Sequence, residues 1–206
     1  MARREEKKQA TRQRLVDIAT DLFCRKGYDN TTVDEIVSLA GISQRTFFRY
    51  FPTKLDVAFP SREKSTAMLR VLLERHQNLS APLLGVRVAL EEYGNWYATL
   101  KDELMREWQY EAASPTLIAR ADETERINEQ LITESLETAG VPREQANLLG
   151  GVIFGGISAV LREWFDNDCQ RELMDVGGDL LRLMEELHRL MPWGVFQPRE
   201  SIPAAR

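Results

Sequence analysis

Residues Thr31–Lys54 read TTVDEIVSLAGISQRTFFRYFPTK, the segment with the strongest local folding signals in the chain. Thr32 and Glu35 have the T-x-x-E spacing of a capping box, in which the hydroxyl and the carboxylate each satisfy a free backbone N–H. A helix is therefore expected to begin at Thr32. It is expected to end at Gly41, because glycine readily takes the left-handed conformation that terminates helices.

A second short helix is predicted directly after this turn. Ser43 is a favourable N-cap, and Pro52 closes the helix because the residue before a proline avoids helical geometry. Phe47 and Phe51 lie four residues apart and are predicted to face the core. Two short helices joined by a glycine turn predict a helix-turn-helix. The outward face of its second helix carries Gln44, Arg45, Phe48 and Arg49.

This outward face has side chains suited to reading DNA bases. Arginine can bind guanine through two hydrogen bonds, glutamine can bind adenine in the same way, and an aromatic ring can contact the thymine methyl group in the major groove. The alternative is a solvated face on an ordinary helical hairpin, because short capped helix pairs are common in all-α proteins. The spacing alone leaves both interpretations open.

A longer helix is predicted before the helix-turn-helix, from Thr11 to Lys26, and Gly27 is expected to end it. Its apolar residues follow the i, i+3, i+4, i+7 spacing of one helical stripe, so this helix is predicted to pack behind the two short ones. The stripe consists of Leu15, Ile18, Ala19, Leu22 and Phe23.

The segment from Arg12 to Leu55 resembles the TetR family of transcriptional repressors. The resemblance rests on RQRLVDIATDLFCRKGY, TTVDEIVSLAGIS and RTFFRYFPTK. It implies an all-α fold in which a three-helix DNA-binding head, residues 1–55, precedes a larger helical ligand-binding and dimerisation domain, residues 56–206. It also implies that Ser43–Phe51 is the recognition helix.

The resemblance further implies roles within the head. Thr32 is expected at the phosphate-contacting start of the first short helix, and Tyr50 and Lys54 are expected to hold the DNA backbone. Members of the family usually carry tyrosine where this chain has Phe48, so only apolar contact is expected there. The residues expected to bind DNA are Thr32, Val33, Ser43, Gln44, Arg45, Thr46, Phe48, Arg49, Tyr50 and Lys54.

Charge is unevenly distributed along the chain of 206 residues. Residues 1–55 hold 11 Lys and Arg against 7 Asp and Glu, a net charge of +4, whereas the whole chain has a net charge of −5. A basic head on an acidic protein fits phosphate binding confined to one end. The charged N-terminus is either part of this site or a disordered tail, and its basic residues are Arg3, Arg4, Lys7 and Lys8.

The remainder of the chain also follows a helical pattern. Pro60 removes a backbone hydrogen bond and is expected to kink or restart the helix that leaves the head, either as a hinge or as a simple boundary. The tail from Pro192, with Trp193 and Phe196, is rich in turn residues. Further helices are predicted over residues 61–78, 83–100, 102–111, 115–139, 145–161 and 171–191.

Two adjacent helices of the body carry many aromatic side chains. Such residues at helical spacing usually form core, but they also line ligand cavities. Arg106 follows Met105 and is expected to meet an anionic head group. RTFFRYFPTK and the later SPTLIAR resemble a TetR subgroup with fatty acyl-CoA-type ligands, which implies an apolar or acyl-CoA-like effector. The expected ligand-binding residues are Tyr93, Trp96, Tyr97, Met105, Arg106 and Trp108.

Residues 145–161, QANLLGGVIFGGISAVL, contain no charged residue. This run is at the short limit for a membrane span, and Gln145, Asn147 and four glycines argue against that interpretation. Gly151 and Gly155 lie four residues apart and allow a second helix to approach closely, which predicts a homodimer interface shared with the last helix. The expected interface residues are Gly151, Gly155, Leu180, Leu183 and Leu187.

The sequence offers no recognisable motif for catalysis or for a cofactor. His76 and His188 complete no metal motif, Cys24 and Cys169 have no metal-ligand spacing, and no glycine-rich phosphate loop carries a lysine. The prediction is a cytoplasmic, non-enzymatic repressor without cofactors or membrane association. It binds double-stranded operator DNA as a homodimer and is released by a mostly apolar small-molecule effector. The alternative is a helical small-molecule-binding or interaction module without DNA binding.

Overall fold

The computed structural model describes residues 2–79 and 81–190, without the side chains of residues 2, 184, 185 and 187–190. The elements that it describes are all α-helices, as predicted. The chain divides into two compact units, Met1–Gly155 and Gly156–Arg206. The helices are α1 (Ala2–Lys26), α2 (Val33–Ala40), α3 (Gln44–Tyr50), α4 (Lys54–Ala58), α5 (Pro60–His76), α6 (Pro82–Ala98), α7 (Lys101–Glu111), α8 (Pro115–Thr138), α9 (Arg143–Asp166) and α10 (Leu173–Leu190).

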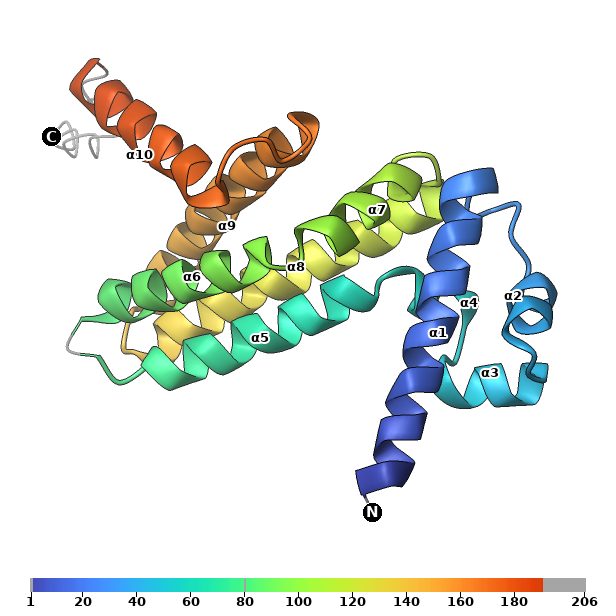
Figure 1. Ribbon diagram of the computed structural model, residues 1–206. Coiled ribbons are helices and arrows are strands. Elements are labelled where there is room, and N and C mark those ends of the chain that lie inside the picture. The colour runs from blue at the N-terminus through green and yellow to red at the C-terminus, as the bar shows by residue number, and fades with distance from the viewer. Residues whose placement is uncertain (1, 80, 191–206) are drawn as a thin grey trace, which may run out of the picture. The chain divides into compact units, whose positions relative to one another are not determined.

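The first four helices form the head of the first unit, and α1 runs between the body and the pair α2 and α3 (Figure 1). The predicted stripe of α1 faces this core, where Leu15 and Phe23 are almost fully buried. The same core takes in Tyr110 of α7 and Leu117 of α8. The head is therefore packed directly onto two helices of the body.

Local sequence signals set the geometry of the helix-turn-helix. The hydroxyl of Thr32 accepts a hydrogen bond from the Glu35 backbone N–H, and the Glu35 carboxylate accepts one from the Thr32 N–H, so the predicted capping box is present. Gly41 ends α2 with a left-handed φ of 63°. Ser43 then caps α3 by accepting from the Thr46 N–H. Both predicted helix boundaries are confirmed.

Pro60 begins a new helix and does not kink a continuous one. It occupies the first position of α5, where the missing N–H costs nothing because the first turn has no intrahelical acceptor for it. Thr53 starts the preceding short helix α4 with a capping box to Asp56. Phe59 alone separates the two helices, so the link between the head and α5 is one residue long.

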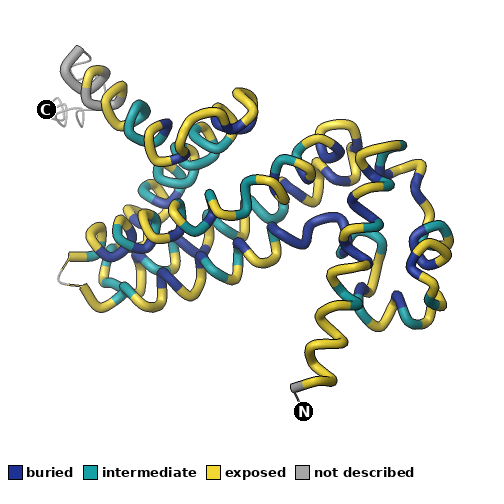
Figure 2. The backbone as a smooth tube through the Cα atoms, in the orientation of Figure 1, coloured by how far each residue is buried: buried dark blue, intermediate teal, exposed yellow. Residues whose placement is uncertain are grey.

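In the body, α5, α6 and α8 pack side by side, and α7 reaches from them to α1 (Figure 1). Buried positions recur along each of these three long helices and alternate with exposed ones (Figure 2). Leu72, Leu73, Ala89 and Leu136 are among the most enclosed side chains of this layer.

The N-terminal part of α9 packs on α8 through a glycine. A Cβ atom added at Gly150 would lie 2.1 Å from Thr133 Oγ1, so a larger residue there would force Thr133 or the helices to shift. Ala146, one turn earlier, is fully buried. Among the described helices, α9 alone is long and apolar enough to cross a bilayer, and 17% of its most apolar 18-residue window is buried.

The second unit is built around the turn between α9 and α10. The indole Nε1 of Trp164 donates to the Arg171 carbonyl at 2.8 Å, and Cys169 and Val176 are buried beside this turn. Leu180 approaches Gly156, whose added Cβ would lie 3.4 Å from Leu180 Cδ2. The tail with Trp193 and Phe196 lies outside the described residues.

Candidate nucleic-acid interface

Helix α3 presents its predicted outward face to solvent. Gln44, Arg45 and Arg49 are exposed, and the Phe48 ring is 44% exposed although it is apolar. On the opposite face Phe47 is fully buried in the head core. The structure therefore holds α3 by one face and leaves a polar and aromatic face free, which is the arrangement that a recognition helix requires.

A hydrogen-bond network fixes the start of α2. Lys26 Nζ donates to Glu35 Oε1, and the second carboxylate oxygen of Glu35 accepts from both the backbone and the hydroxyl of Thr32. Hydrogen bonds from Lys26 and then from Thr32 lower the pKa of the Glu35 carboxyl to about 2. The Thr32 hydroxyl is thus already engaged, which leaves the free backbone N–H groups of the first turn to meet an anion.

Lys54 is positioned by the loop between α1 and α2. Its Nζ donates to the carbonyl oxygens of Tyr28 and Thr31 at 2.8 and 2.9 Å and lies 3.9 Å from the centroid of the Tyr28 ring. Partial burial lowers the pKa of the Lys54 ammonium. The structure therefore places this charge at the base of the loop that leads into Thr32.

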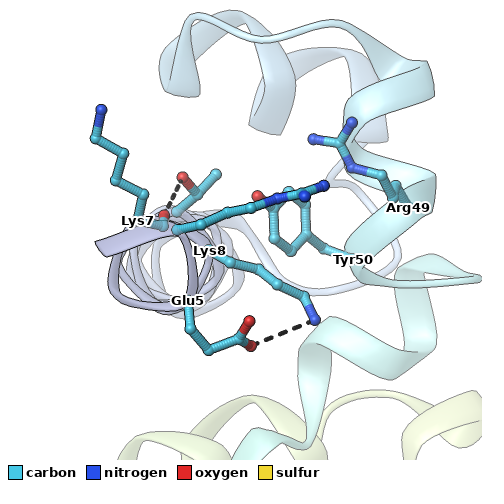
Figure 3. Close-up of a pocket in the computed structure, with 7 residues that line it drawn as sticks. Glu5, Lys7, Lys8, Arg49 and Tyr50 are labelled. Atoms are coloured by element: carbon cyan, nitrogen blue, oxygen red, sulfur yellow. Dashed lines mark hydrogen bonds and ion pairs between the residues drawn. The ribbon is translucent and has the colours of Figure 1, made fainter. Parts of the chain in front are cut away.

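A basic groove of about 670 Å³ lies between the first turns of α1 and the end of α3. Arg49 and Tyr50 face the turns of α1 that carry Lys7 and Lys8, and Lys8 also forms a 3.6 Å ion pair with Glu5 (Figure 3). The N-terminal arm is part of α1 here, whereas the sequence predicted the helix only from Thr11. Its first turns form one side of the groove. Its lining consists of Arg4, Glu5, Lys7, Lys8, Thr11, Arg49 and Tyr50.

The head thus joins the exposed polar and aromatic face of α3 to an adjoining basic groove. Arg45 extends from the second position of α3, and Val33 and Thr46 lie in the first turns of the two short helices. Side chains on the exposed face of a major-groove helix contact bases, while basic residues beside it contact phosphates. The arrangement is suited to binding duplex DNA.

A second group of polar residues is enclosed within the body. We call Arg62, Tyr93, Tyr97, Glu107 and Glu111 the polar cluster. Arg62 forms an ion pair with Glu111, and the Tyr93 and Tyr97 rings lie 5.5 Å apart. Burial raises the pKa of both tyrosines, and the charge of Arg62 opposes this.

Glu107 is the most enclosed acid of the polar cluster, with 3% of its surface exposed. Its Oε1 accepts from the Ser61 backbone N–H at 2.9 Å, in the first turn of α5, where no side chain of α5 provides a cap. Its Oε2 is buried without a hydrogen-bond partner among the described residues. Burial raises the pKa of this carboxyl to about 7.

The predicted ligand-binding residues do not all share one environment. Tyr93 and Tyr97 are buried, and the Trp96 ring lies 6.1 Å from that of Tyr93. Arg106 is exposed, and its carbonyl accepts from the Cys24 thiol of α1. Sequence reasoning missed Arg62, Glu107 and Glu111. Met105 and Trp108 are partly buried on α7.

Two residues of α7 contact both sides of the junction between α4 and α5. Tyr110 Oη donates to the Ala58 carbonyl at 2.6 Å, just before the junction, and Glu107 accepts from Ser61 just after it. The Tyr110 ring also packs against Phe23 of α1, with centroids 5.3 Å apart. Helix α7 therefore connects the polar cluster to the head.

The predicted interface residues of α9, Gly151 and Gly155, lie on the same side of the helix but have different surroundings. Gly151 faces Glu129 of α8, whose Oε1 would be 3.4 Å from an added Cβ, whereas Gly155 has nothing within 4 Å. Leu148 and Val152 are 72% and 61% exposed. In α10, Leu180 is partly buried and Leu183 is exposed, while the side chain of Leu187 lies outside the described residues.

Residues 15–59 match the model of the bacterial regulatory proteins of the tetR family. The HTH-type transcriptional regulator TcmR of Streptomyces glaucescens is 42% identical over 55 residues, 27% of this chain and 24% of that protein. The uncharacterized HTH-type regulator YvkB of Bacillus subtilis is 27% identical over 154 residues, 70% of this chain and 80% of that protein. The chain spans 24% and 34% of the first two curated relatives that it matches.

The fold is similar to solved structures of bacterial regulators over most of the chain. FadR of Thermus thermophilus, a TetR-family repressor crystallised with lauroyl-CoA, has a TM-score of 0.56 and 26% identity, covering 95% of this chain and 99% of that one. The fatty acid degradation regulator FadR of Bacillus halodurans has a TM-score of 0.60 and 21% identity, covering 84% and 94%. The head is therefore similar to the tetR family of bacterial regulatory proteins over residues 15–59, and the fold is similar to that of these two regulators over most of the chain.

Proposed function

We propose that the protein is a transcriptional repressor that binds a pseudo-palindromic operator as a homodimer and is released by a mostly apolar small molecule. The observation that carries the proposal is the exposed face of α3, with Arg45 and Phe48 outward and Phe47 buried behind them. The family match at residues 15–59 supports it. As a DNA-binding regulator without a membrane partner, the protein acts in the cytoplasm.

The DNA contacts are divided between two surfaces of the head. The exposed face of α3 reads bases, and the basic groove holds the adjoining phosphates through Arg4, Lys7 and Arg49. A two-fold dimer presents two such heads to half-sites about 34 Å apart, one turn of the double helix. Residues 1–55 thus provide the DNA contacts, and residues 56–206 provide the ligand and dimer contacts.

The dimer forms through the exposed face of α9. Leu148, Val152, Gly155 and Ala159 follow helical spacing on one side of α9 and are exposed. The opposite side of α9 packs on α8 through Gly150. One side of α9 therefore contacts protein, unlike a membrane helix that is surrounded by lipid. A second copy of the chain would cover the apolar side, and Gly155 would allow the helices to approach closely.

The effector binds beside the polar cluster, where Tyr93, Trp96 and Tyr97 provide ring surface. A ligand shifts an equilibrium only by its differential affinity for two shapes of the protein. Helix α7 can couple ligand binding to the head, because Glu107 and Tyr110 hydrogen-bond to the backbone on either side of Phe59. A ligand that displaces α7 changes the support of the head, so the two recognition helices no longer match successive major grooves. The acyl-CoA bound by the Thermus relative makes acyl thioesters the first compounds to test.

The proposal is tested by selecting bound duplexes from a random library with the full-length protein. Binding of the selected duplex is then measured by fluorescence anisotropy for wild type and for Arg45→Ala. The variant is expected to lose roughly 1 to 3 kcal/mol of binding free energy and to relax sequence preference at one base pair in each half-site. Selection of no sequence above background would contradict DNA recognition.

Release is tested separately by calorimetry with lauroyl-CoA and with dodecanoate, in the presence and absence of the selected duplex. A compound that acts as effector must bind more weakly when DNA is present, because coupling between two binding sites is reciprocal. A compound that binds equally tightly in both cases would confirm a ligand site and contradict the release mechanism.

A further inference from the structure

Asp34 lies beside the recognition helix although it belongs to α2. It occupies the first turn of α2 and is exposed, and its Oδ1 accepts a hydrogen bond from the side-chain Nε2 of Gln44, the first residue of α3. The turn through Gly41 and the Ser43 cap hold the two helix starts in this relation. A residue of the supporting helix thus contacts a residue expected to read bases.

The contact fixes the orientation of the Gln44 amide. An ionised carboxylate only accepts hydrogen bonds, so the amide nitrogen of Gln44 must face Asp34. One of the two amide N–H groups is then occupied. The free hydrogen-bonding groups that remain on Gln44 are one N–H donor and the Oε1 acceptor.

This remaining pair suits adenine and not guanine. Adenine presents an N7 acceptor and an N6 amino donor in the major groove, which match one N–H and one oxygen. Guanine presents two acceptors, N7 and O6. A glutamine would need both of its N–H groups to satisfy them, and Asp34 already occupies one on Gln44.

We infer that Asp34 is a specificity-determining residue, which orients the Gln44 amide so that it recognises adenine and rejects guanine. The inference rests on the proposed DNA-binding function. Asp34 acts through Gln44, and it forms no ion pair with a Lys or Arg of the described residues. Its charge therefore faces the DNA phosphates unneutralised, which lowers affinity for every sequence.

Asp34 thus raises the discrimination between adenine and guanine through Gln44 but lowers the overall DNA affinity through its charge. The two effects can therefore be measured separately. If Asp34 orients Gln44, Asp34→Asn binds the selected duplex as tightly as wild type or more tightly, yet discriminates less between adenine and guanine. A residue that only stabilised the helix-turn-helix would weaken binding when replaced. The asparagine has nearly the same shape, but its side chain both donates and accepts, so it imposes no orientation on Gln44.

The experiment uses the full-length protein and the duplex selected above. Gln44→Ala first identifies the base pair that Gln44 reads, as the position whose preference that variant loses. Duplexes with each base at that position are then titrated with wild type, Asp34→Asn and Asp34→Ala. Asp17→Asn is the matched control, because Asp17 accepts from Gln13 in an equivalent exposed pair on α1, at 2.9 Å.

Wild type and Asp17→Asn are expected to prefer adenine over guanine by roughly 5- to 150-fold, the range of one bidentate contact. Both Asp34 variants are expected to reduce that ratio to about twofold or less. An unchanged ratio in both, or a Gln44→Ala variant that loses no preference, would overturn the inference while DNA binding stands. Failure of wild type to select any duplex would instead overturn the proposed function, and the inference with it.

Discussion

The hydroxyl of Tyr110 donates to the carbonyl oxygen of Ala58 at 2.6 Å, within the buried core that the head shares with α7. Ala58 is the last residue of α4, and its carbonyl has no partner further along that helix because the chain turns at Phe59 into α5. The tyrosine therefore satisfies a backbone group at the one-residue link between the head and the body. The end of α4 is therefore stabilised by a side chain of α7, a helix that is distant in the sequence.

Tyr110→Phe tests the energetic value of this link. The variant keeps the ring packing against Phe23 but leaves the buried Ala58 carbonyl without its donor, so unfolding in urea should show a loss of roughly 1 to 3 kcal/mol. Tyr50→Phe is the control, since Tyr50 is only partly buried and packs against the edge of the core. Equal stability of Tyr110→Phe and wild type would mean that water replaces the hydroxyl at Ala58.

The raised pKa of Glu107 predicts a pH dependence of stability. The unfolded chain releases this proton near pH 4.5, whereas the folded chain keeps it to about pH 7, so the folded state binds more protons in between. Stability should therefore fall as pH rises from 4.5 to 7 and level off above, by an amount of up to roughly 3 kcal/mol from this group. Urea unfolding at intervals across that range measures the slope.

Glu107→Gln provides the matched comparison, because the amide is neutral at every pH and its oxygen can still accept from the Ser61 N–H. The variant should have a flatter profile between pH 4.5 and 7 than wild type. Glu111 contributes in the same direction, since burial raises its pKa against the opposing charge of Arg62, so a residual slope should remain. Parallel profiles of variant and wild type would show that Glu107 ionises normally.

Local signals in the sequence predicted the head because they act over a few residues. The capping box of Thr32, the left-handed Gly41 and the Ser43 cap each involve groups at most four positions apart, and the helix-turn-helix follows from them. The start of α1 was missed by nine residues. Its first turns carry charged residues without an apolar stripe, and such a segment gives no periodic signal.

The polar cluster was not predictable for a different reason. Arg62, Glu107 and Glu111 have the spacing of solvated helix positions, and only tertiary packing encloses them and pairs Arg62 with Glu111. The same limit applies to adjacent glycines. The close contact of Gly150 with Thr133 of α8 was not predicted, because the spacing of the glycines does not show which of them faces the chain's own core. The predicted approach of a second copy at Gly151 and Gly155 stays a prediction.

Lys54 and Lys7 are predicted to affect DNA binding in different ways, Lys54 by stabilising the fold of the head and Lys7 by its charge. Lys54→Ala removes two hydrogen bonds that hold the loop before Thr32, so it should lower the melting temperature and weaken binding to all sequences. Since its charge is spent within the head, the slope of log affinity against log salt should stay unchanged. Lys7→Ala should leave the melting temperature unchanged and reduce that slope by about one.

Anisotropy titrations at several salt concentrations, together with thermal melting, distinguish the two. A reduced salt slope in Lys54→Ala would show that Lys54 leaves the carbonyls of Tyr28 and Thr31 to contact a phosphate. An unchanged slope in Lys7→Ala would remove the basic groove from the DNA interface, because Lys7 lines that groove.

Val152→Glu should convert the dimer into monomers. Val152 is 61% exposed in the single chain and lies one turn from Leu148 on the apolar side of α9. If a second copy covers this side, the variant buries an uncompensated carboxylate in each copy, at a cost of roughly 3 to 5 kcal/mol per charge. Val71→Glu is the matched control, because Val71 is 48% exposed on α5 and lies outside the proposed interface.

Sedimentation velocity should show dimers of wild type and of Val71→Glu, and monomers of Val152→Glu. Monomeric Val152→Glu should also lose most of its affinity for a two-half-site duplex while keeping its weak affinity for a single half-site. If Val152→Glu remained dimeric, the subunits would have to meet through another face.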